Sequence, residues 1–329
     1  MTTASKILCI VERAGPGLDD TAWELLGAAR ALVGDGGRVG AALLGEGVGD
    51  LASELARGYD DVWAFDDARL ASWDGEAYAR AVAPLVAREQ PALILAAHTN
   101  LGIDFAPGLS VRAGVPLLPD CLALEHADGG TFEAVRAIYG GKVHARYACT
   151  PSEQGVMATL RAGAFAAAEP GAAASGEIHT ESLADDVGQG RRPVRTVEPE
   201  AGEVDITQAS ILVGVGRGIE DEENLEIVQS LAEALGGEVA CSRPVVDKGW
   251  LPKSRQVGTS GVTVKPKVYV AVGISGSFQH VGGIKGSPFL VAINKDARAP
   301  IFGVADVGVV DDLFDVVPAL EEKIREAKG

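Results

Sequence analysis

The sequence predicts an α/β protein of two domains, each with a mainly parallel sheet flanked by helices. Three observations lead to this prediction. The chain has 329 residues, which is about two domains by the usual size relation. Its residues are 47% hydrophobic, as expected of a folded globular chain. Apolar, β-rich runs alternate with amphipathic stretches of about 10–15 residues, and this alternation is typical of βαβ units.

The first domain opens with four strands that alternate with four helices. The strands are expected at Lys6–Glu12, Arg38–Gly45, Asp61–Phe65 and Pro91–His98. The helices are expected at Asp19–Val33, Val48–Arg57, Glu76–Arg88 and Asn100–Ala113. Acidic residues near the start of the first helix, and Gly34 after its end, match the preferences of helix termini.

After these helices the sequence pattern changes. Between Pro119 and Phe165, apolar and polar residues alternate, which predicts antiparallel strands and hairpins added to the edge of the same domain. The segment Ala166–Thr207 has little hydrophobic periodicity, so we expect a surface excursion and a linker, with Pro193–Val197 as one candidate strand. The domain boundary is expected between residues 204 and 205, inside the polar stretch Glu198–Thr207.

The second domain is expected to be another parallel sheet with a polar edge. Strands are expected at Ile211–Val215, Glu238–Val246, Lys267–Val272, Phe289–Ile293 and Pro300–Val304, and helices at Asp221–Leu235 and Leu313–Ala327. Several of these strands end in turns that carry Gly, Ser, Asn or Arg. In a parallel sheet such turns meet at the carboxyl edge, where α/β proteins place nucleotides. Backbone N–H groups, short hydroxyls and cations suit a diphosphate and a polar ring better than a metal.

Charge and composition exclude several classes of function. The net charge of −17 argues against nucleic-acid binding, which needs basic patches. No apolar run approaches the roughly 18 residues that span a bilayer, so direct membrane insertion is not expected. No signal peptide is expected either, and the four scattered cysteines lack a CxxC pair. These observations favour a reduced, cytoplasmic compartment and argue against a metal site.

Six blocks of sequence fill most of the C-terminal third. They are GRG at Gly216–Gly218, CSRPVVD at Cys241–Asp247, QVGTSG at Gln256–Gly261, VAVGISGSFQHVGGIKGS at Val270–Ser287, INKD at Ile293–Asp296 and APIFGVADVGVVDDLF at Ala299–Phe314. In this order and at this spacing they resemble the α subunit of electron transfer flavoproteins. The N-terminal two thirds is similar to the family only in layout. The resemblance implies a doubly wound, FAD-binding second domain and a first domain that contacts a β subunit.

The first two blocks contain the cationic candidates. The turn around Arg217 is not a GxGxxG motif, because Ile219 stands where a later glycine would be counted, so locally it reads as a tight strand-to-helix turn. By resemblance, Arg217 binds FAD, Ser242 contacts the cofactor and Arg243 lies near the isoalloxazine. A fixed cation there would stabilise negative charge on the reduced ring. The local alternative for Arg243 is a surface ion pair.

The third and fourth blocks contain the polar candidates. The family usually reads QVGQTG where this chain has Thr259 and Ser260. The hydroxyl of Ser260 stands where the family places a hydrogen bond to flavin N5, but serine has a freer rotamer than threonine. By resemblance, His280 approaches the pyrimidine edge of the flavin, and the local alternative is a satisfied core histidine. Arg243, Ser260 and His280 are expected to tune the flavin chemistry.

Further positions are assigned to cofactor binding by the resemblance alone. They are Val257, Gly258, Thr259, Ser275, Gly276, Ser277, Phe278, Gln279, Asn294, Asp312 and Leu313. Asn and Asp at the ends of elements are also common caps, so Asn294 and Asp312 are open to that reading. In the first domain, His98-Thr99-Asn100 ends an apolar strand, and we interpret it as a subunit interface or a turn cap.

No GxSxG, HExxH or P-loop motif is present, so the chain is expected to be an electron carrier rather than a substrate-converting enzyme. The resemblance implies a heterodimer whose β subunit carries AMP or a second FAD. It also implies dehydrogenase donors, of the acyl-CoA type or similar, and a quinone reductase or other acceptor. The alternatives are a subunit of a flavin-based bifurcating complex that oxidises NADH, an NAD(P)-binding oxidoreductase subunit, and a structural subunit that has lost its flavin.

Overall fold

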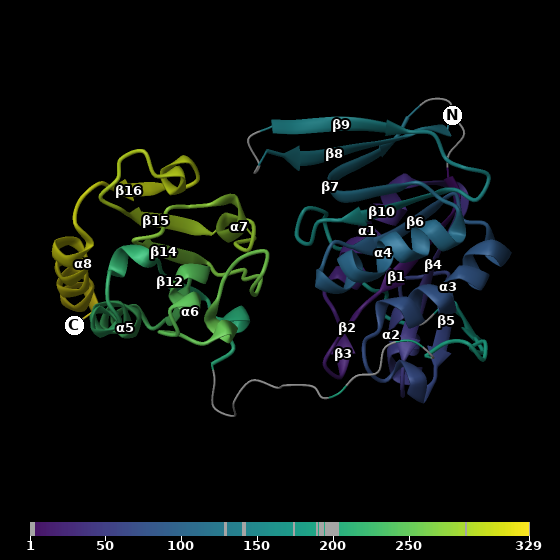
Figure 1. Cartoon of the computed structure of the whole chain (residues 1–329), viewed down its shortest axis with the longest axis horizontal. Helices are drawn as coiled ribbons and strands as arrows, with labels where there is room; N and C mark the ends of the chain where they lie inside the picture. Colours follow the sequence, from purple (N-terminus) through teal and green to yellow (C-terminus); the bar gives the residue numbers. More distant parts are fainter. Residues whose placement is uncertain are drawn as a thin grey trace. The chain divides into compact units, whose positions relative to one another are not determined.

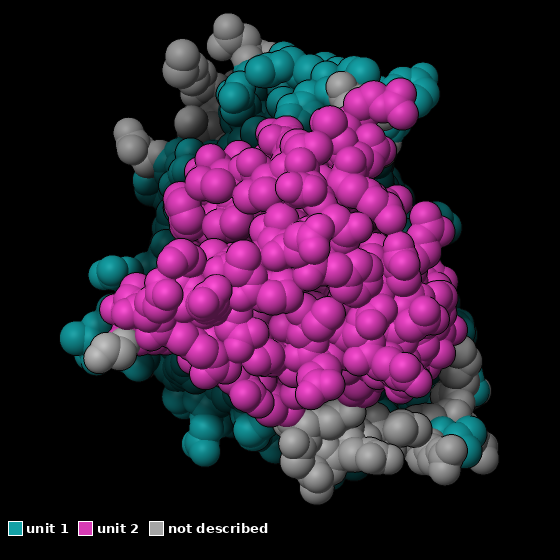
Figure 2. All heavy atoms as spheres, turned by 90° about the vertical axis from the view of Figure 1, so that its left-hand side faces the viewer, with its two compact units in different colours: residues 1–196 teal, residues 197–329 magenta. Residues whose placement is uncertain are grey.

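The computed structural model describes residues 4–127, 130–139, 143–173, 175–188, 190, 194, 204–286 and 288–328. The chain divides into two compact units, Met1–Thr196 and Val197–Gly329. Figure 2 colours them separately. Each unit contains a mainly parallel sheet with helices on its faces, as the sequence predicts (Figure 1).

The sheet of the first unit has nine strands within the described residues, in the order β11-β5-β4-β1-β6-β10-β7-β8-β9. These strands are β1 (Ala4–Val11), β4 (Val33–Gly45), β5 (Asp61–Asp66), β6 (Leu93–Ala97), β7 (Leu117–His126), β8 (Phe132–Ile138), β9 (Val143–Cys149), β10 (Val156–Leu160) and β11 (Glu177–Thr180). Among the described strands of this sheet, only β7–β8 and β8–β9 pair antiparallel, so the predicted antiparallel extension does lie at its edge. A separate two-stranded hairpin joins β2 (Arg13–Ala14) and β3 (Gly17–Leu18).

Two expectations for the first unit were wrong. Strand β10 lies in the segment expected to be antiparallel, yet it pairs parallel with both β6 and β7. Its run VMATL is buried along its whole length, so no alternation marked its direction. Strand β11 lies in the expected surface excursion and pairs parallel with β5. Of Pro193–Val197, only Val194 is described, and it is in no strand; the rest lies outside the described residues.

Helices cover both faces of this sheet. They are α1 (Thr21–Leu32), α2 (Gly49–Leu55), α3 (Gly75–Glu89) and α4 (Asn100–Ala113), with the short η1 (Ala68–Leu70). Strand β1 alternates between two cores. Ile7 packs in the core that includes α1 and α2, and Leu8 packs in the core that includes α3 and α4. The central parallel strands of the sheet are therefore buried on both faces, as parallel sheets are.

The second unit has five parallel strands within the described residues, in the order β13-β12-β14-β15-β16. They are β12 (Ile211–Val215), β13 (Glu238–Cys241), β14 (Val268–Val272), β15 (Phe289–Ile293) and β16 (Val307–Val309). The helical segments are η3 (Ile206–Gln208), η4 (Arg217–Ile219), η5 (Glu222–Asn224), α5 (Leu225–Leu235), α6 (Arg243–Asp247), η6 (Lys253–Arg255), α7 (Phe278–Val281), η7 (Pro300–Gly303) and α8 (Leu313–Lys328). Helices α5 and α8 pack against one face of the sheet.

Three elements of this unit differ from those predicted. The strand expected at Glu238–Val246 ends at Cys241, because Pro244 near the start of α6 favours a helix beginning there. The strand expected at Pro300–Val304 is the short helix η7, and the edge strand β16 follows it. The helix expected from Asp221 begins as the separate turn η5 before α5 starts.

Within the part of the chain that the structure describes, no helix combines the length and the apolar character needed to cross a membrane.

Candidate functional site

A cavity of about 740 Å³ lies at the carboxyl edge of the sheet in the second unit. It is lined by the segments that follow β12, β13, β14 and β15, together with the loop from Gln256 to Ser260. Its volume is in the range of pockets that hold cofactors and other small molecules. Strand β12 has β13 on one side and β14 on the other. After β12 the chain forms β13 on one side of it and then crosses over to form β14 on the other side. This reversal of strand order is the switch point at which open α/β sheets bind ligands.

Glycines let the two loops at this switch point touch. A Cβ on Gly216 would lie 2.2 Å from the carbonyl oxygen of Gly273, and one on Gly218 would lie 2.8 Å from the Gly273 Cα. Gly218 also donates its N–H to the Gly273 carbonyl at 3.1 Å. The glycine motif therefore does form the tight strand-to-helix turn that its local sequence predicts. The same close approach brings Arg217, which lines the cavity, next to the loop that follows β14.

The two arginines that line this cavity are weakly held. Arg217 is exposed and has no ion pair with any residue that the structure describes. Arg243 begins α6 with its side chain 69% exposed, and its Nε lies 3.4 Å from a carboxylate oxygen of Asp247. The surface-pair alternative for Arg243 is thus present. Such exposed pairs contribute little, so an anionic ligand can compete for the guanidinium.

A buried amide supports the hydroxyl of Ser260. The side chain of Gln256 is buried, and its Nε2 donates to Ser260 Oγ at 2.9 Å. Because the Ser260 oxygen accepts this bond, its own O–H is left to donate into the cavity that both residues line. Gln256 was not among the predicted site residues, although it begins the third of the sequence blocks that carry the resemblance.

The loop that carries Ser260 is tied to α7. Thr259 donates its N–H to the Gln279 carbonyl at 2.8 Å, and Val257 donates to Cys241 at 2.9 Å. Gly258 has φ +145°, and a Cβ there would lie 2.9 Å from the Gln279 carbonyl oxygen. Only glycine adopts this backbone readily, and it has no side chain to hold the loop away from α7. Gly258 therefore permits the close contact between the loop and α7.

His280 is the one buried ionisable side chain lining this cavity among the described residues. It is 4% exposed, and its Nε2 lies 2.9 Å from the hydroxyl of Tyr269. Its Nδ1 is buried without a hydrogen-bond partner. Burial lowers the pKa of His280 to about 4, and the Val257 backbone opposes this shift only in part, so the ring is neutral at pH 7. The satisfied-core alternative therefore accounts for Nε2. The Val257 backbone lies close enough to the ring to oppose the fall in its pKa, but it makes no well-formed hydrogen bond with Nδ1.

The structure brings most of the predicted residues together at this cavity. Those that line it are Arg217, Ser242, Arg243, Val257, Gly258, Ser260, Ser275, Ser277, Gln279, His280 and Asn294. Thr259, Gly276, Phe278, Asp312 and Leu313 do not line it, and their cofactor contacts stay a prediction.

Two of the predicted cofactor-binding positions, Asn294 and Asp312, have structural roles in the chain itself. The Asn294 amide donates to the Ile274 carbonyl at 2.9 Å, and its oxygen accepts from the Asp296 N–H. A carboxylate oxygen of Asp312 accepts from the Phe314 N–H at 3.0 Å at the start of α8. These are the cap-like contacts that the sequence left open as the alternative.

The predicted motif His98-Thr99-Asn100 in the first unit is held by internal hydrogen bonds. Thr99 accepts from the Gly102 N–H at 3.0 Å and so caps α4, and it donates to both oxygens of Glu12 at 2.7 and 2.8 Å. The Nδ1 of His98 bonds the hydroxyl of Thr159 at 2.9 Å. The capping interpretation of this motif is confirmed.

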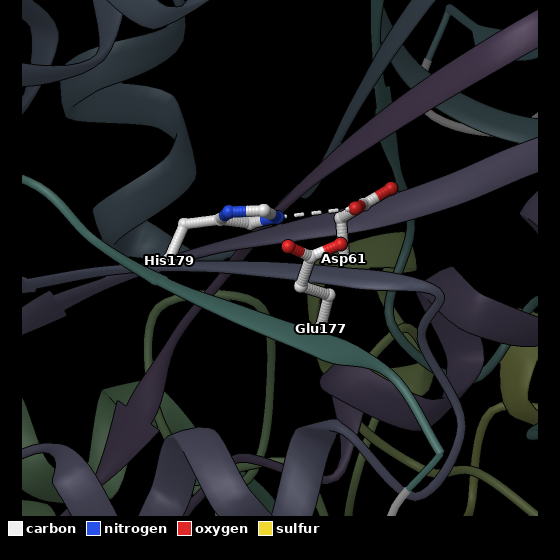
Figure 3. Close-up of side chains that lie close together, drawn as sticks. All are labelled: Asp61, Glu177 and His179. Atoms are coloured by element: carbon white, nitrogen blue, oxygen red, sulfur yellow. Dashed lines mark hydrogen bonds and ion pairs between the residues drawn. The ribbon is translucent and has the colours of Figure 1, made fainter.

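Three possible metal ligands meet on the sheet of the first unit. Figure 3 shows Asp61 of β5 with Glu177 and His179 of β11. Arg38 donates to both oxygens of Asp61 at 2.8 Å, and His179 lies 3.1 Å from one of them. Burial alone would raise the pKa of Asp61, but the bonds from Arg38 and His179 outweigh it and lower the pKa. The ion pair with Arg38 and the hydrogen bond with His179 thus account for the position of Asp61.

Two family models match the chain. The electron transfer flavoprotein domain matches residues 7–186, and the electron transfer flavoprotein FAD-binding domain matches residues 205–285. The chain belongs to the electron transfer flavoprotein family. The resemblance seen in the C-terminal blocks is thereby confirmed, and so is FAD as the cofactor. The FAD-binding domain model ends at residue 285, so its match includes most of the loops around the cavity.

Relatives match over the whole chain. It is 36% identical to the electron transfer flavoprotein subunit alpha of Thermoanaerobacterium thermosaccharolyticum, over 100% of both chains. It is 37% identical to the electron transfer flavoprotein subunit alpha of Megasphaera elsdenii, over 98% of this chain and 97% of that one. It is also 33% identical to the lactate dehydrogenase (NAD(+),ferredoxin) subunit LctC of Acetobacterium woodii, over 91% of this chain and 72% of that one.

The residues around the cavity suit FAD. Exposed guanidinium groups at Arg217 and Arg243 match a diphosphate and an electron-accepting ring. The available O–H of Ser260 and the unpartnered Nδ1 of His280 match the hydrogen-bonding groups of a flavin. Of the buried polar atoms without a partner in the described residues, the Nδ1 of His280 is the one that belongs to a residue lining this cavity, where a ligand can reach it.

Proposed function

We propose that this chain is the FAD-carrying subunit of a heterodimer that moves electrons from dehydrogenases to a quinone reductase or another acceptor. Residues 205–329 form the FAD domain, and residues 1–204 contact the β subunit. Donors of the acyl-CoA dehydrogenase type and a cytoplasmic location belong to the same proposal. The observation that carries it is the cavity at the switch point, with the unpartnered Nδ1 of His280 in its wall.

In this proposal the chain's own residues hold the cofactor and set its surroundings. Arg217 binds the diphosphate, and Ser242 and Ser260 supply hydroxyl groups. Arg243 places a positive charge near the ring, which favours the arrival of an electron. His280 contributes a neutral hydrogen-bonding group. FAD, when bound, supplies the redox chemistry, since no side chain here is a redox group.

A bifurcating complex is the second candidate. The observation that favours it is the similarity to LctC, named as a subunit of an NAD(+)- and ferredoxin-dependent lactate dehydrogenase. The acryloyl-CoA reductase electron transfer subunit beta of Anaerotignum propionicum, which is 34% identical over 95% of this chain, is another relative named for a larger reductase. In that case the β subunit carries a second FAD, whereas a simple carrier has AMP there.

Flavin stoichiometry tests the proposal. The chain is co-expressed with its β-like partner, and the cofactors of the purified complex are extracted and counted. We expect at least one FAD for each copy of this chain. One flavin plus AMP identifies the simple carrier, and two flavins that NADH reduces identify the bifurcating type. A correctly assembled complex that releases NAD(P), or that binds no flavin when FAD is supplied, contradicts the proposal.

A further inference from the structure

A tyrosine hydroxyl lies behind the histidine of the cofactor cavity. Tyr269 of β14 is fully buried, and its hydroxyl oxygen is 2.9 Å from His280 Nε2. The two rings meet edge to face, with their centroids 6.0 Å apart and an angle of 63° between their planes. Tyr269 does not line the cavity, so any effect that it has on a ligand acts through His280.

The neighbouring strand makes room for this hydroxyl. Gly214 lies in the interior of β12, and a Cβ there would be 2.2 Å from the Tyr269 hydroxyl oxygen. Glycine inside a strand weakens the strand and often marks a close approach of other atoms. Any larger residue at this position would displace the tyrosine. The sheet therefore accommodates the hydroxyl itself in addition to the aromatic ring.

The direction of the hydrogen bond follows from the donors available. Burial raises the pKa of Tyr269, so its O–H stays protonated, and His280 is neutral at pH 7. Within the described part of the chain, the tyrosine hydroxyl makes no other hydrogen bond. If the histidine donated from Nε2, the buried tyrosine proton would have no acceptor, which is unfavourable. The tyrosine therefore donates, and His280 Nε2 accepts.

We propose that Tyr269 is a positioning residue that fixes the tautomer of His280. A neutral imidazole has one N–H, so a ring whose Nε2 accepts from Tyr269 carries its hydrogen on Nδ1. His280 then presents a neutral N–H donor, suited to an electron-rich oxygen or nitrogen of the cofactor. Such a donor stabilises added negative charge without taking up a proton. The inference rests on the proposed function only for the identity of that ligand as FAD.

The ¹⁵N spectrum of the histidine rings tests this inference directly. The full-length chain is labelled at its five histidines, and the His280 signals are assigned from their loss in His280→Gln. We expect a protonated, pyrrole-type Nδ1 and an unprotonated, pyridine-type Nε2. Tyr269→Phe keeps the ring and removes the hydroxyl. In this variant the ratio of the Nδ1-protonated to the Nε2-protonated tautomer should fall about two- to tenfold, the effect of losing one buried hydrogen bond.

Tyr59→Phe is the matched control. It removes another buried tyrosine hydroxyl, which donates to the Ala22 carbonyl at 2.6 Å in the first unit, and it should leave the His280 signals unchanged. A wild-type spectrum with the proton on Nε2 overturns the inference, even if Tyr269→Phe fails to fold. Unchanged signals in a folded Tyr269→Phe also overturn it.

The two proposals fail separately. The tautomer is measured on the chain before FAD is added. A complex that never binds FAD but shows the expected tautomer would remove the proposed function alone. A complex that binds flavin, formed by a chain that carried the proton on Nε2 before FAD was added, would remove only the role of Tyr269.

Discussion

The two units share an architecture but differ in how they use the carboxyl edge of the sheet. In the first unit, strand β1 lies between β4 and β6, as β12 lies between β13 and β14 in the second. Polar side chains follow the central strands in both. In the first unit they bond one another: Glu12 with Thr99, His98 with Thr159, and Arg161 with Asp120.

In the second unit, several polar groups at the corresponding edge lack a hydrogen-bond or ion-pair partner among the described residues. Arg217 has no ion pair with a described residue, Ser260 has a hydroxyl proton to donate, and the Nδ1 of His280 is buried without a partner. The backbone architecture alone therefore does not identify the binding site. The unpartnered groups of the second unit line one cavity, and this clustering is what suits the cavity to a ligand.

The largest expected effect comes from filling the glycine contact under the cavity. In Gly216→Ala, the new methyl group would lie 2.2 Å from a backbone oxygen of Gly273, so the loops after β12 and β14 must separate. We expect a loss of about 3 kcal/mol of unfolding free energy, at the upper end for overpacking, together with a loss of bound flavin. Denaturant titration and flavin absorbance measure the two effects.

Gly303→Ala is the control for that variant. Gly303 lies in the same unit, and a Cβ there meets no atom within 4 Å. It should retain wild-type stability and flavin content. Equal behaviour of the two variants would show that the close approach at Gly216 does not hold the cavity together.

A smaller effect is expected from pH on stability, through Glu12 at the carboxyl edge of the sheet in the first unit. Burial raises the pKa of Glu12 to about 7, and the hydrogen bond from Thr99 only partly offsets this. The folded state then binds one more proton than the unfolded chain between the ordinary value of 4.5 and pH 7. Stability from Glu12 is therefore greatest below pH 4.5 and decreases up to pH 7, by at most about 1.4 kcal/mol per pH unit.

Glu12→Gln tests this directly, because the neutral amide removes the titration. Denaturant titrations between pH 4.5 and 7 should show a flatter dependence in the variant than in the wild type. Glu153→Gln, which changes an exposed glutamate of the same unit, should keep the wild-type slope. If Glu12→Gln and wild type have the same slope, Glu12 is already ionised across this range.

Long apolar strands and their helices were predictable from the sequence because burial leaves a clear pattern. Strand β6 and helix α4 fall close to the expected residues. Strand β11 was missed because its four residues, EIHT, are mostly exposed at the edge of the sheet. The direction of β10 was missed because a fully buried run carries no signal of parallel or antiparallel pairing.

The candidate site was predictable only as far as its residues lie in recognisable blocks. The blocks place Ser260 and His280 at one cavity. Gln256 was missed because its role depends on a contact with Ser260 across a folded loop. Tyr269 was missed because an aromatic residue inside an apolar strand reads as core. Its relation to His280 requires three elements to meet, including the strand that holds Gly214.

Hydrogen exchange of the heterodimer with and without FAD tests the central claim most directly, since it compares the two edges in one measurement. The account predicts slower amide exchange on FAD binding in residues 256–261 and 273–280, around the cavity. It predicts no change at residues 98–102, where the polar groups already bond one another. FAD-dependent protection confined to the edge of the first unit, with none around the cavity, would contradict it.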